Sequence, residues 1–319
     1  MNSSPTTHPL PSPQDTTSAS HESASVVAVA RRATGPARAQ LKSKPTAISQ
    51  RLGIPLHTTA VRRTHSAWYT RDGHPLPITA AANGEKRPTT LRDARRLGLF
   101  PAVATILDVI ARPVLQTWIV EQGILSSITL PRGDDETPDA FARRVAADMN
   151  SHRDQAARLG ARIHHAIGQT LAGLPPDPEI AAHLVELKKW FAAVNVKPLA
   201  IDIDRVSLEW GFGGRIDLYA EVHGQPALID VRSQDVKKAK PNFYENWPLH
   251  LAAHRQILRE TGHRVEACYT VIVDAHAGRP IHVRHWTNDD LDFDTFAATF
   301  TLWKYLKSYD PLTAAQEAA

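Results

Sequence analysis

Two apolar, strand-like segments of this sequence each carry one acidic residue. Residues 214–222 contain Asp217, and residues 226–232 contain Asp230 together with Arg232. Residues i and i+2 of a strand face the same side, so Asp230 and Arg232 point together, and pairing of the two strands can bring Asp217 beside them. Two convergent carboxylates with an adjacent cation indicate a divalent metal site that acts on phosphate.

An ordinary hairpin is the alternative for the same two segments. In that case the acidic and basic side chains would lie on the solvent-exposed face and bind nothing. Buried carboxylates, by contrast, need a compensating cation, because burial of an isolated charge is unfavourable. Taken alone, the two segments are compatible with both.

Three further motifs surround the acidic segments. Residues 160–164 read Gly-Ala-Arg-Ile-His, residues 250–254 read His-Leu-Ala-Ala-His, and residues 101–118 include Pro-Ala-Val-Ala-Thr-Ile-Leu and Arg-Pro-Val-Leu-Gln-Thr-Trp. In this order, the motifs and the acidic segments resemble the D…(D/E)-x-K signature and accompanying helices of the PD-(D/E)XK nuclease superfamily. The resemblance is to its RecB-type branch, which includes phage-type exonucleases, and it spans about residues 69–309.

The resemblance implies an α/β (α+β) fold with a restriction-endonuclease-like core, in which helices flank a central mixed sheet. Hydrophobic periodicity and turn residues predict the individual elements. Helices are expected over residues 99–122, 137–149, 154–171, 178–193, 244–260 and 289–309, and strands over residues 199–209, 214–222, 226–232, 265–273 and 281–286. Pro113 should begin or kink a helix.

Three regions are expected along the chain. Residues 1–45 are rich in Ser, Thr, Pro and Ala and include several basic residues, which predicts a disordered basic tail. Residues 46–150 are expected to form an N-terminal polar and helical region that packs on the core. Residues 151–319 are expected to form the nuclease-like core.

The resemblance also implies roles for individual residues. Asp217, Asp230 and Arg232 would be catalytic, and Asp217 and Asp230 would bind the metal. The backbone carbonyl of Val231 would add an oxygen ligand, and His164 would add an imidazole from the preceding helix. Oxygen ligands suit Mg²⁺ or Mn²⁺, and an imidazole shifts the preference toward Mn²⁺.

Two parts of the site depart from the family's pattern. Arg232 replaces the usual lysine, and because arginine is effectively always charged it can clamp phosphate but cannot take a proton. His250 and His254 replace a glutamine and a tyrosine, and their i, i+4 spacing puts both on one helix face. They are candidates to bind phosphate or metal, or else polar residues on an exposed helix. The set fits a working site and also a decayed one.

The sequence therefore leads to a Mg²⁺- or Mn²⁺-dependent deoxyribonuclease, an exonuclease rather than an endonuclease, which hydrolyses phosphodiester bonds with a metal-activated water. The alternative is a catalytically weakened DNA-binding protein that keeps the nuclease fold. A third class is an α/β interaction domain without a metal. The presence of His164, Asp217 and Asp230 together favours the enzyme.

The positive net charge of the chain is compatible with DNA as a partner. The net charge is +4 and the isoelectric point about 9.2, and such a balance predicts only non-specific attraction to polyanions. Lys237 and Lys238 are candidate phosphate contacts, or else solvated lysines. Residues 66–96 interleave Trp68 and Tyr69 with cations, which is typical of a surface for single-stranded nucleic acid and equally of a solvated surface.

The remaining features predict a cytoplasmic protein with no membrane partner. The single cysteine, Cys268, excludes an internal disulfide framework and lies in an apolar run, which favours a buried core thiol. No apolar segment approaches the roughly 20 residues that span a bilayer.

Overall fold

The computed structural model describes residues 66–111, 113–236 and 240–317. All of them belong to one compact unit, Pro45–Ala319. The tail predicted over residues 1–45 and the candidate phosphate contacts Lys237 and Lys238 lie outside the described residues.

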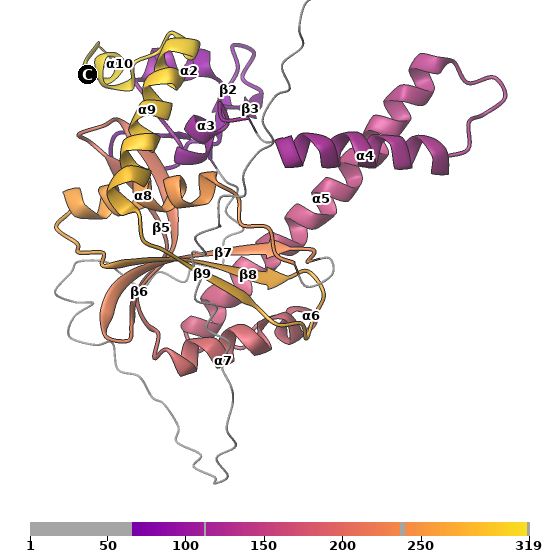
Figure 1. The fold of residues 1–319 in the computed structure, drawn as a ribbon. Helices are drawn as coiled ribbons and strands as arrows, with labels where there is room; N and C mark the ends of the chain where they lie inside the picture. The colour runs from indigo at the N-terminus through magenta and orange to yellow at the C-terminus, as the bar shows by residue number, and fades with distance from the viewer. Residues whose placement is uncertain (1–65, 112, 237–239, 318–319) are drawn as a thin grey trace, which may run out of the picture. The chain divides into compact units, whose positions relative to one another are not determined.

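A five-stranded mixed sheet lies at the centre of this unit (Figure 1). Its strands, in both sequence and spatial order, are β5 (Lys197–Ser207), β6 (Phe212–Val222), β7 (Gln225–Gln234), β8 (Ala267–Asp274) and β9 (His282–Trp286). Neighbouring strands are antiparallel, except that β7 and β8 are parallel. Parallel neighbours need a long crossover, and α8 (Asn246–Glu260) provides it. The expectation of a mixed α/β fold is confirmed.

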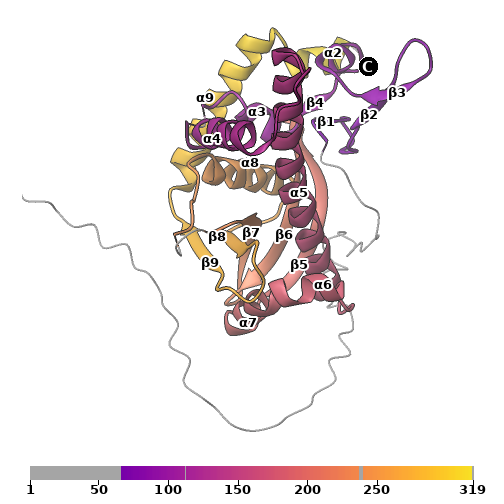
Figure 2. The same cartoon turned by 90° about the vertical axis from the view of Figure 1, so that its right-hand side faces the viewer.

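Helices cover both faces of the sheet (Figures 1 and 2). On one face, the long helix α5 (Pro138–Leu171) packs with α6 (Pro178–Ala181), a 3₁₀ turn (Ala182–Leu184) and α7 (Val185–Ala193). Their apolar side chains form one buried cluster with β5, β6, β7 and β8. The opposite face is covered by α8, whose Leu251 and Leu258 join a second buried cluster. The sheet is therefore apolar on both sides.

The first described elements pack against the last ones. They are β1 (Trp68–Tyr69), β2 (Ile78–Ala80), β3 (Lys86–Pro88), α2 (Leu91–Leu97), β4 (Phe100–Pro101) and α3 (Val103–Leu107), and the last are α9 (Asp289–Lys307) and α10 (Pro311–Glu317). Trp68 lies in a buried cluster with Phe212 and Trp303. The hydroxyl of Tyr309 donates hydrogen bonds to the carbonyls of Ala94, at 3.1 Å, and Leu99, at 2.6 Å.

The burial of this region excludes one of the sequence interpretations. Trp68 is 5% exposed and Tyr69 is 2% exposed. The Tyr69 hydroxyl donates to Asp204 in β5 at 3.2 Å, and Asp204 also pairs with Arg215 in β6. The two aromatic residues therefore belong to the core, and they cannot stack on nucleic acid beside the cations of residues 66–96.

Two predicted helix boundaries were wrong. Residues 137–149 and 154–171 were expected to form separate helices, but α5 is continuous, since residues 150–153 (Asn-Ser-His-Arg) contain no glycine or proline to break it. Residues 99–122 were expected to be helical, with Pro113 beginning or kinking a helix, but they contain the short strand β4 before α3. The helix α4 (Pro113–Thr129) does begin at Pro113, as predicted.

Strands β6 and β7 separate in the middle of the sheet. Their pairing runs from Val222 opposite Gln225 to Leu218 opposite Ile229, and it ends there. The next residue of β6 beyond this last pair is Asp217, and the next residue of β7 is Asp230. The two acidic residues therefore lie at the point where the ladder opens.

The same position marks a change of face in β6 and β5. In β6, Leu218 packs in the cluster on the α5 side, whereas Ile216 packs in the cluster on the α8 side. Ile201 and Ile203 of β5 differ in the same way. Residues i and i+2 of a regular strand share a face. Both strands are therefore irregular at this position, and their side chains change from one face of the sheet to the other. The left-handed backbone of Asp202 (φ 53°) marks the irregularity in β5.

Candidate active site

Asp217 fills the gap between the separated strands. Its Oδ2 accepts a hydrogen bond from the backbone N–H of Val231 at 3.3 Å, so a carboxylate satisfies a donor that the β6–β7 ladder has released. The Nδ1 atom of His164 lies 3.7 Å from the same oxygen. A buried backbone group, a carboxylate from β6 and an imidazole from α5 thus meet at one place.

Gly160 lets α5 approach β7 closely enough to place His164. A Cβ atom at Gly160 would lie 2.8 Å from Oγ of Ser233 in β7. His164 follows four residues later, on the same side of the helix. Burial lowers the pKa of His164, and the positive charge of Arg232 lowers it further. The imidazole is therefore neutral at pH 7, which is the form that binds metals.

Asp230 and Arg232 form an ion pair on the α8 side of β7. Nε of Arg232 donates to Oδ2 of Asp230 at 2.6 Å, as the i, i+2 spacing predicts. His250 in α8 completes this group, because its Nδ1 lies 3.4 Å from Nη2 of Arg232 and 4.0 Å from Oδ1 of Asp230. Burial raises the pKa of Asp230 to about 6, with Asp217 adding to the rise and Arg232 opposing it.

His254 lies behind His250 and is only 3% exposed. The two rings are 4.3 Å apart between centroids, and a Cβ atom at Gly214 of β6 would overlap Nε2 of His254. Burial lowers the pKa of His254 to about 3, with Arg232 contributing. The sequence interpretation placed His254 beside His250 as a substrate-binding residue. In this structure the buried ring packs against His250, and a role of His254 in substrate binding stays a prediction.

We refer to the residues that converge here as the acidic site: His164, Asp217, Asp230, Val231, Arg232 and His250. They come from α5, β6, β7 and α8. Asp217 contacts Val231 and His164, whereas Asp230, Arg232 and His250 form a second set of contacts, and the charges of the two sets influence one another. Within the acidic site, the Asp230 carboxylate is held by Arg232. Among the described residues, a different group has three possible metal-ligand atoms that all lie within 4.8 Å of one another.

That second group consists of Asp235, Asp274 and His276. Asp235 follows β7 and Asp274 ends β8, so the two lie at the carboxyl ends of parallel strands. Nε2 of His276 is 3.2 Å from Oδ1 of Asp235, and Asp274 accepts the backbone N–H of His276 at 2.8 Å and lies 3.5 Å from Nη1 of Arg279. The sequence analysis missed this group, although Asp-Ala-His directly after an apolar strand was a usable signal.

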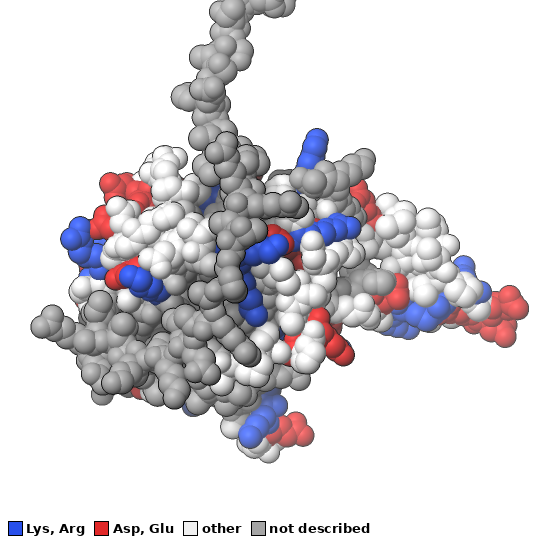
Figure 3. Space-filling model, turned by 90° about the horizontal axis from the view of Figure 1, so that it is seen from below, with Lys and Arg blue, Asp and Glu red and all other residues white. Residues whose placement is uncertain are grey.

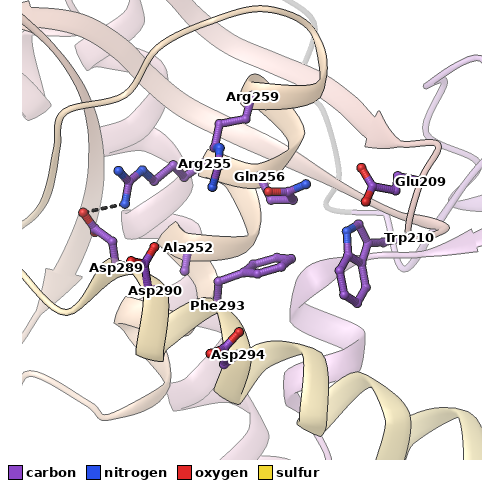
Figure 4. Close-up of a pocket in the computed structure, with 10 residues that line it drawn as sticks. All are labelled: Glu209, Trp210, Ala252, Arg255, Gln256, Arg259, Asp289, Asp290, Phe293 and Asp294. Carbon is purple, nitrogen blue, oxygen red and sulfur yellow. Dashed lines mark ion pairs between the residues drawn. The ribbon is translucent and has the colours of Figure 1, made fainter.

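A surface pocket of about 340 Å³ lies elsewhere, between α8 and α9 (Figure 4). Arg255 and Arg259 reach into it from α8, and Asp289, Asp290 and Asp294 face them from α9. Arg255 and Asp289 form an ion pair at 2.5 Å. Since these opposite charges face each other and no residue of the acidic site lines the pocket, we do not assign catalysis to it.

One face of the molecule carries charges of both signs. On the face seen in Figure 3, the visible described Lys and Arg side chains alternate with Asp and Glu, and they do not merge into one basic patch. Within the described part of the chain, none of the helices has the length and apolar character needed to cross a membrane.

Two comparisons of the sequence with known proteins were negative. No model of a protein family matches the sequence, and no curated protein matches it.

Proposed function

We propose that this chain is a metal-dependent DNA nuclease with a restriction-endonuclease-like core of the PD-(D/E)XK type. One observation carries the proposal: β6 separates from β7 immediately before Asp217 and Asp230. A regular hairpin would pair these positions and leave no opening. Beyond the last pair, the Asp217 carboxylate lies beside His164 of α5, and Asp230 lies beside Arg232 and His250.

The donor set fits Mg²⁺ or Mn²⁺. Asp217, Asp230 and the carbonyl of Val231 would supply oxygen ligands, and His164 would supply a nitrogen. The pKa of Asp230, raised to about 6 by burial, is consistent with a carboxylate that lacks enough compensating charge in its buried position. A bound divalent ion would activate water and stabilise negative charge on the scissile phosphate.

The other residues would position the substrate. Arg232 stays protonated, and its planar guanidinium can hold two phosphate oxygens at once. Its 2.6 Å contact with Asp230 uses Nε, so Nη1 and Nη2 could face a phosphate without breaking this ion pair. His250 borders both groups and would hold Arg232 in that position. The resemblance to the phage-type branch favours an exonuclease over an endonuclease.

A second candidate is a DNA-binding protein that keeps this fold without cleaving. The Arg232–Asp230 ion pair favours it, because a fixed cation that neutralises the buried carboxylate makes a metal ion unnecessary there. In this case the acidic site would stabilise the sheet, and Arg232 would contribute positive charge for phosphate.

Cleavage assays with end-labelled linear DNA and closed circular DNA, with Mn²⁺ or with EDTA, separate these candidates. We expect Mn²⁺-dependent loss of the linear substrate. The Asp217→Asn variant should be at least about 100-fold slower, since even residues that support a metal ligand change activity by up to that factor. The matched control is Asp274→Asn, which removes a carboxylate from the second group and should cleave like the wild type.

Calorimetric Mn²⁺ titration of the same three proteins assigns the ion. Weaker binding in Asp217→Asn alone places it at the acidic site. Equal binding in wild type and Asp217→Asn, with loss in Asp274→Asn, would overturn the assignment. If no cleavage reaction consumes DNA but the protein still binds it, the second candidate, a DNA-binding protein that does not cleave, would remain.

A further inference from the structure

A row of aromatic and guanidinium groups leads away from the acidic site. The Arg232 guanidinium lies 5.7 Å from the ring centre of Trp247, and the rings of Trp247 and Phe243 are 6.0 Å apart. Phe243 is in turn 6.4 Å from Trp286, over which Arg284 lies at 4.1 Å. We call these five residues the aromatic track.

Two separate parts of the chain build the track. Phe243 precedes α8 and Trp247 lies in the first turn of α8, whereas Arg284 and Trp286 occupy alternate positions of β9 and therefore share one face. The indole N–H of Trp286 donates to the hydroxyl of Thr270 in β8 at 3.0 Å, which fixes that ring. The Trp286 ring is therefore held in place by the fold before any ligand arrives.

The aromatic rings of the track are accessible at the surface of the protein. Phe243, Trp247 and Trp286 are each partly exposed, and Arg284 is exposed. By contrast, Trp68 and Trp303 are buried in the core. Partly exposed aromatic rings with guanidinium groups over them are typical of surfaces where unpaired bases stack while their phosphates meet positive charge. Paired bases are already stacked in a duplex and cannot use it.

We propose that the aromatic track binds a single-stranded segment of DNA, with bases on Phe243, Trp247 and Trp286 and a phosphate on Arg284. The inference rests on the proposed nuclease function and names the form of its substrate. Arg232 belongs to both the track and the acidic site, so a strand on the track passes directly beside Asp230. An unpaired end would thus be led to the carboxylates.

Binding can be measured without cleavage. In EDTA, fluorescence anisotropy of a labelled oligothymidylate should show binding that is tighter than binding of a blunt duplex hairpin of equal charge. Phe243→Ala should weaken oligothymidylate binding by about 5- to 150-fold, the range for loss of one stacked base. Phe243→Leu, which keeps an apolar side chain but removes the ring, should weaken it with an unchanged melting temperature. Arg284→Gln should also weaken it.

The matched controls are an exposed aromatic residue and an exposed arginine outside the track. Tyr305 in α9 is 82% exposed, and the side chain of Arg264 is 84% exposed. Tyr305→Ala and Arg264→Gln should bind the oligonucleotide like the wild type. Equal losses in these controls would mean that general charge and surface hydrophobicity account for binding, and the inference would fail.

The two proposals fail separately. If the wild type cleaves DNA in Mn²⁺ but Phe243→Leu and Arg284→Gln bind oligothymidylate normally, the track is only an internal aromatic contact and the nuclease proposal stands. If the wild type never cleaves but these variants lose single-strand binding, the track is supported and the nuclease proposal falls. Duplex binding that equals single-strand binding would also overturn the inference.

Discussion

Arg232 has more contacts than a lysine could make at the same position. Its guanidinium contacts Asp230 at 2.6 Å and His250 at 3.4 Å, and it lies over Trp247. These contacts use separate nitrogens and the flat face of the group. A lysine ammonium is a compact point charge without such a face. An arginine at this position therefore holds the site together through contacts that a lysine could not make.

Replacement of Arg232 by lysine should lower Mn²⁺-dependent cleavage by about 10-fold or more, because the bidentate fork for phosphate is lost. The measurement is single-turnover cleavage of a labelled linear substrate. Arg264→Lys, at an exposed position outside the acidic site, is the control. If Arg232→Lys cleaves faster than the wild type, the site needs a group that can exchange a proton, and the phosphate-clamp role of Arg232 is wrong.

The packing of α8 on β6 depends on a glycine and a buried histidine. Gly214 lies against the ring of His254, and a methyl group at this position would overlap Nε2. A buried ring cannot move aside without displacing α8, which also carries His250. One close contact between two elements thus sets the position of a residue in the acidic site.

Substitution of Gly214 by alanine should therefore destabilise the protein by about 1–3 kcal/mol, the usual effect of overpacking. Chemical denaturation of Gly214→Ala, His254→Ala and the double variant measures the coupling. We expect the double variant to be more stable than the sum of the single effects predicts. Gly168→Ala in α5 is the control, because a methyl group there would lie 3.8 Å from Cγ2 of Ile201, an ordinary van der Waals distance. Additive effects at Gly214 and His254 would contradict the packing.

At the level of elements, the sequence predicted the strands of the sheet to within a few residues, because their apolar runs are long. It could not predict the separation of β6 from β7, since periodicity reports which residues are apolar and not which strand they pair with. The two-residue strands β1 and β4 are too short to have a period. The burial of Trp68 and Tyr69 was also missed, because the residues that cover them lie far along the chain.

The site shows the same division. Asp230 and Arg232 were placed together from their spacing alone, because i, i+2 geometry is local. The burial of His254 and the aromatic track were not accessible in this way. Phe243 and Trp286 meet only because β9 pairs with β8, and β8 lies beside β7.

For the molecule as a whole, Cys268 reports whether the sheet is intact. It lies in β8 and is 1% exposed, and burial raises its pKa to about 12. The thiolate is the reactive form, so the native protein should resist iodoacetamide at pH 8 and react rapidly in denaturant. Mass spectrometry of the alkylated protein checks this. Rapid modification under native conditions would show that β8 is accessible.

The contacts of Tyr309 with Ala94 and Leu99 bear on how the chain can be made in the cell. The Tyr309–Leu99 hydrogen bond joins residues that are 210 positions apart, and Trp68 packs on both Trp303 and Tyr309. Long-range contacts of this kind form late and slowly. During synthesis, the elements around Trp68 emerge from the ribosome long before the residues that they pack against. Until Trp303 and Tyr309 have been made, this surface lacks these partners, and nascent chains that stop before Trp303 should be bound by chaperones.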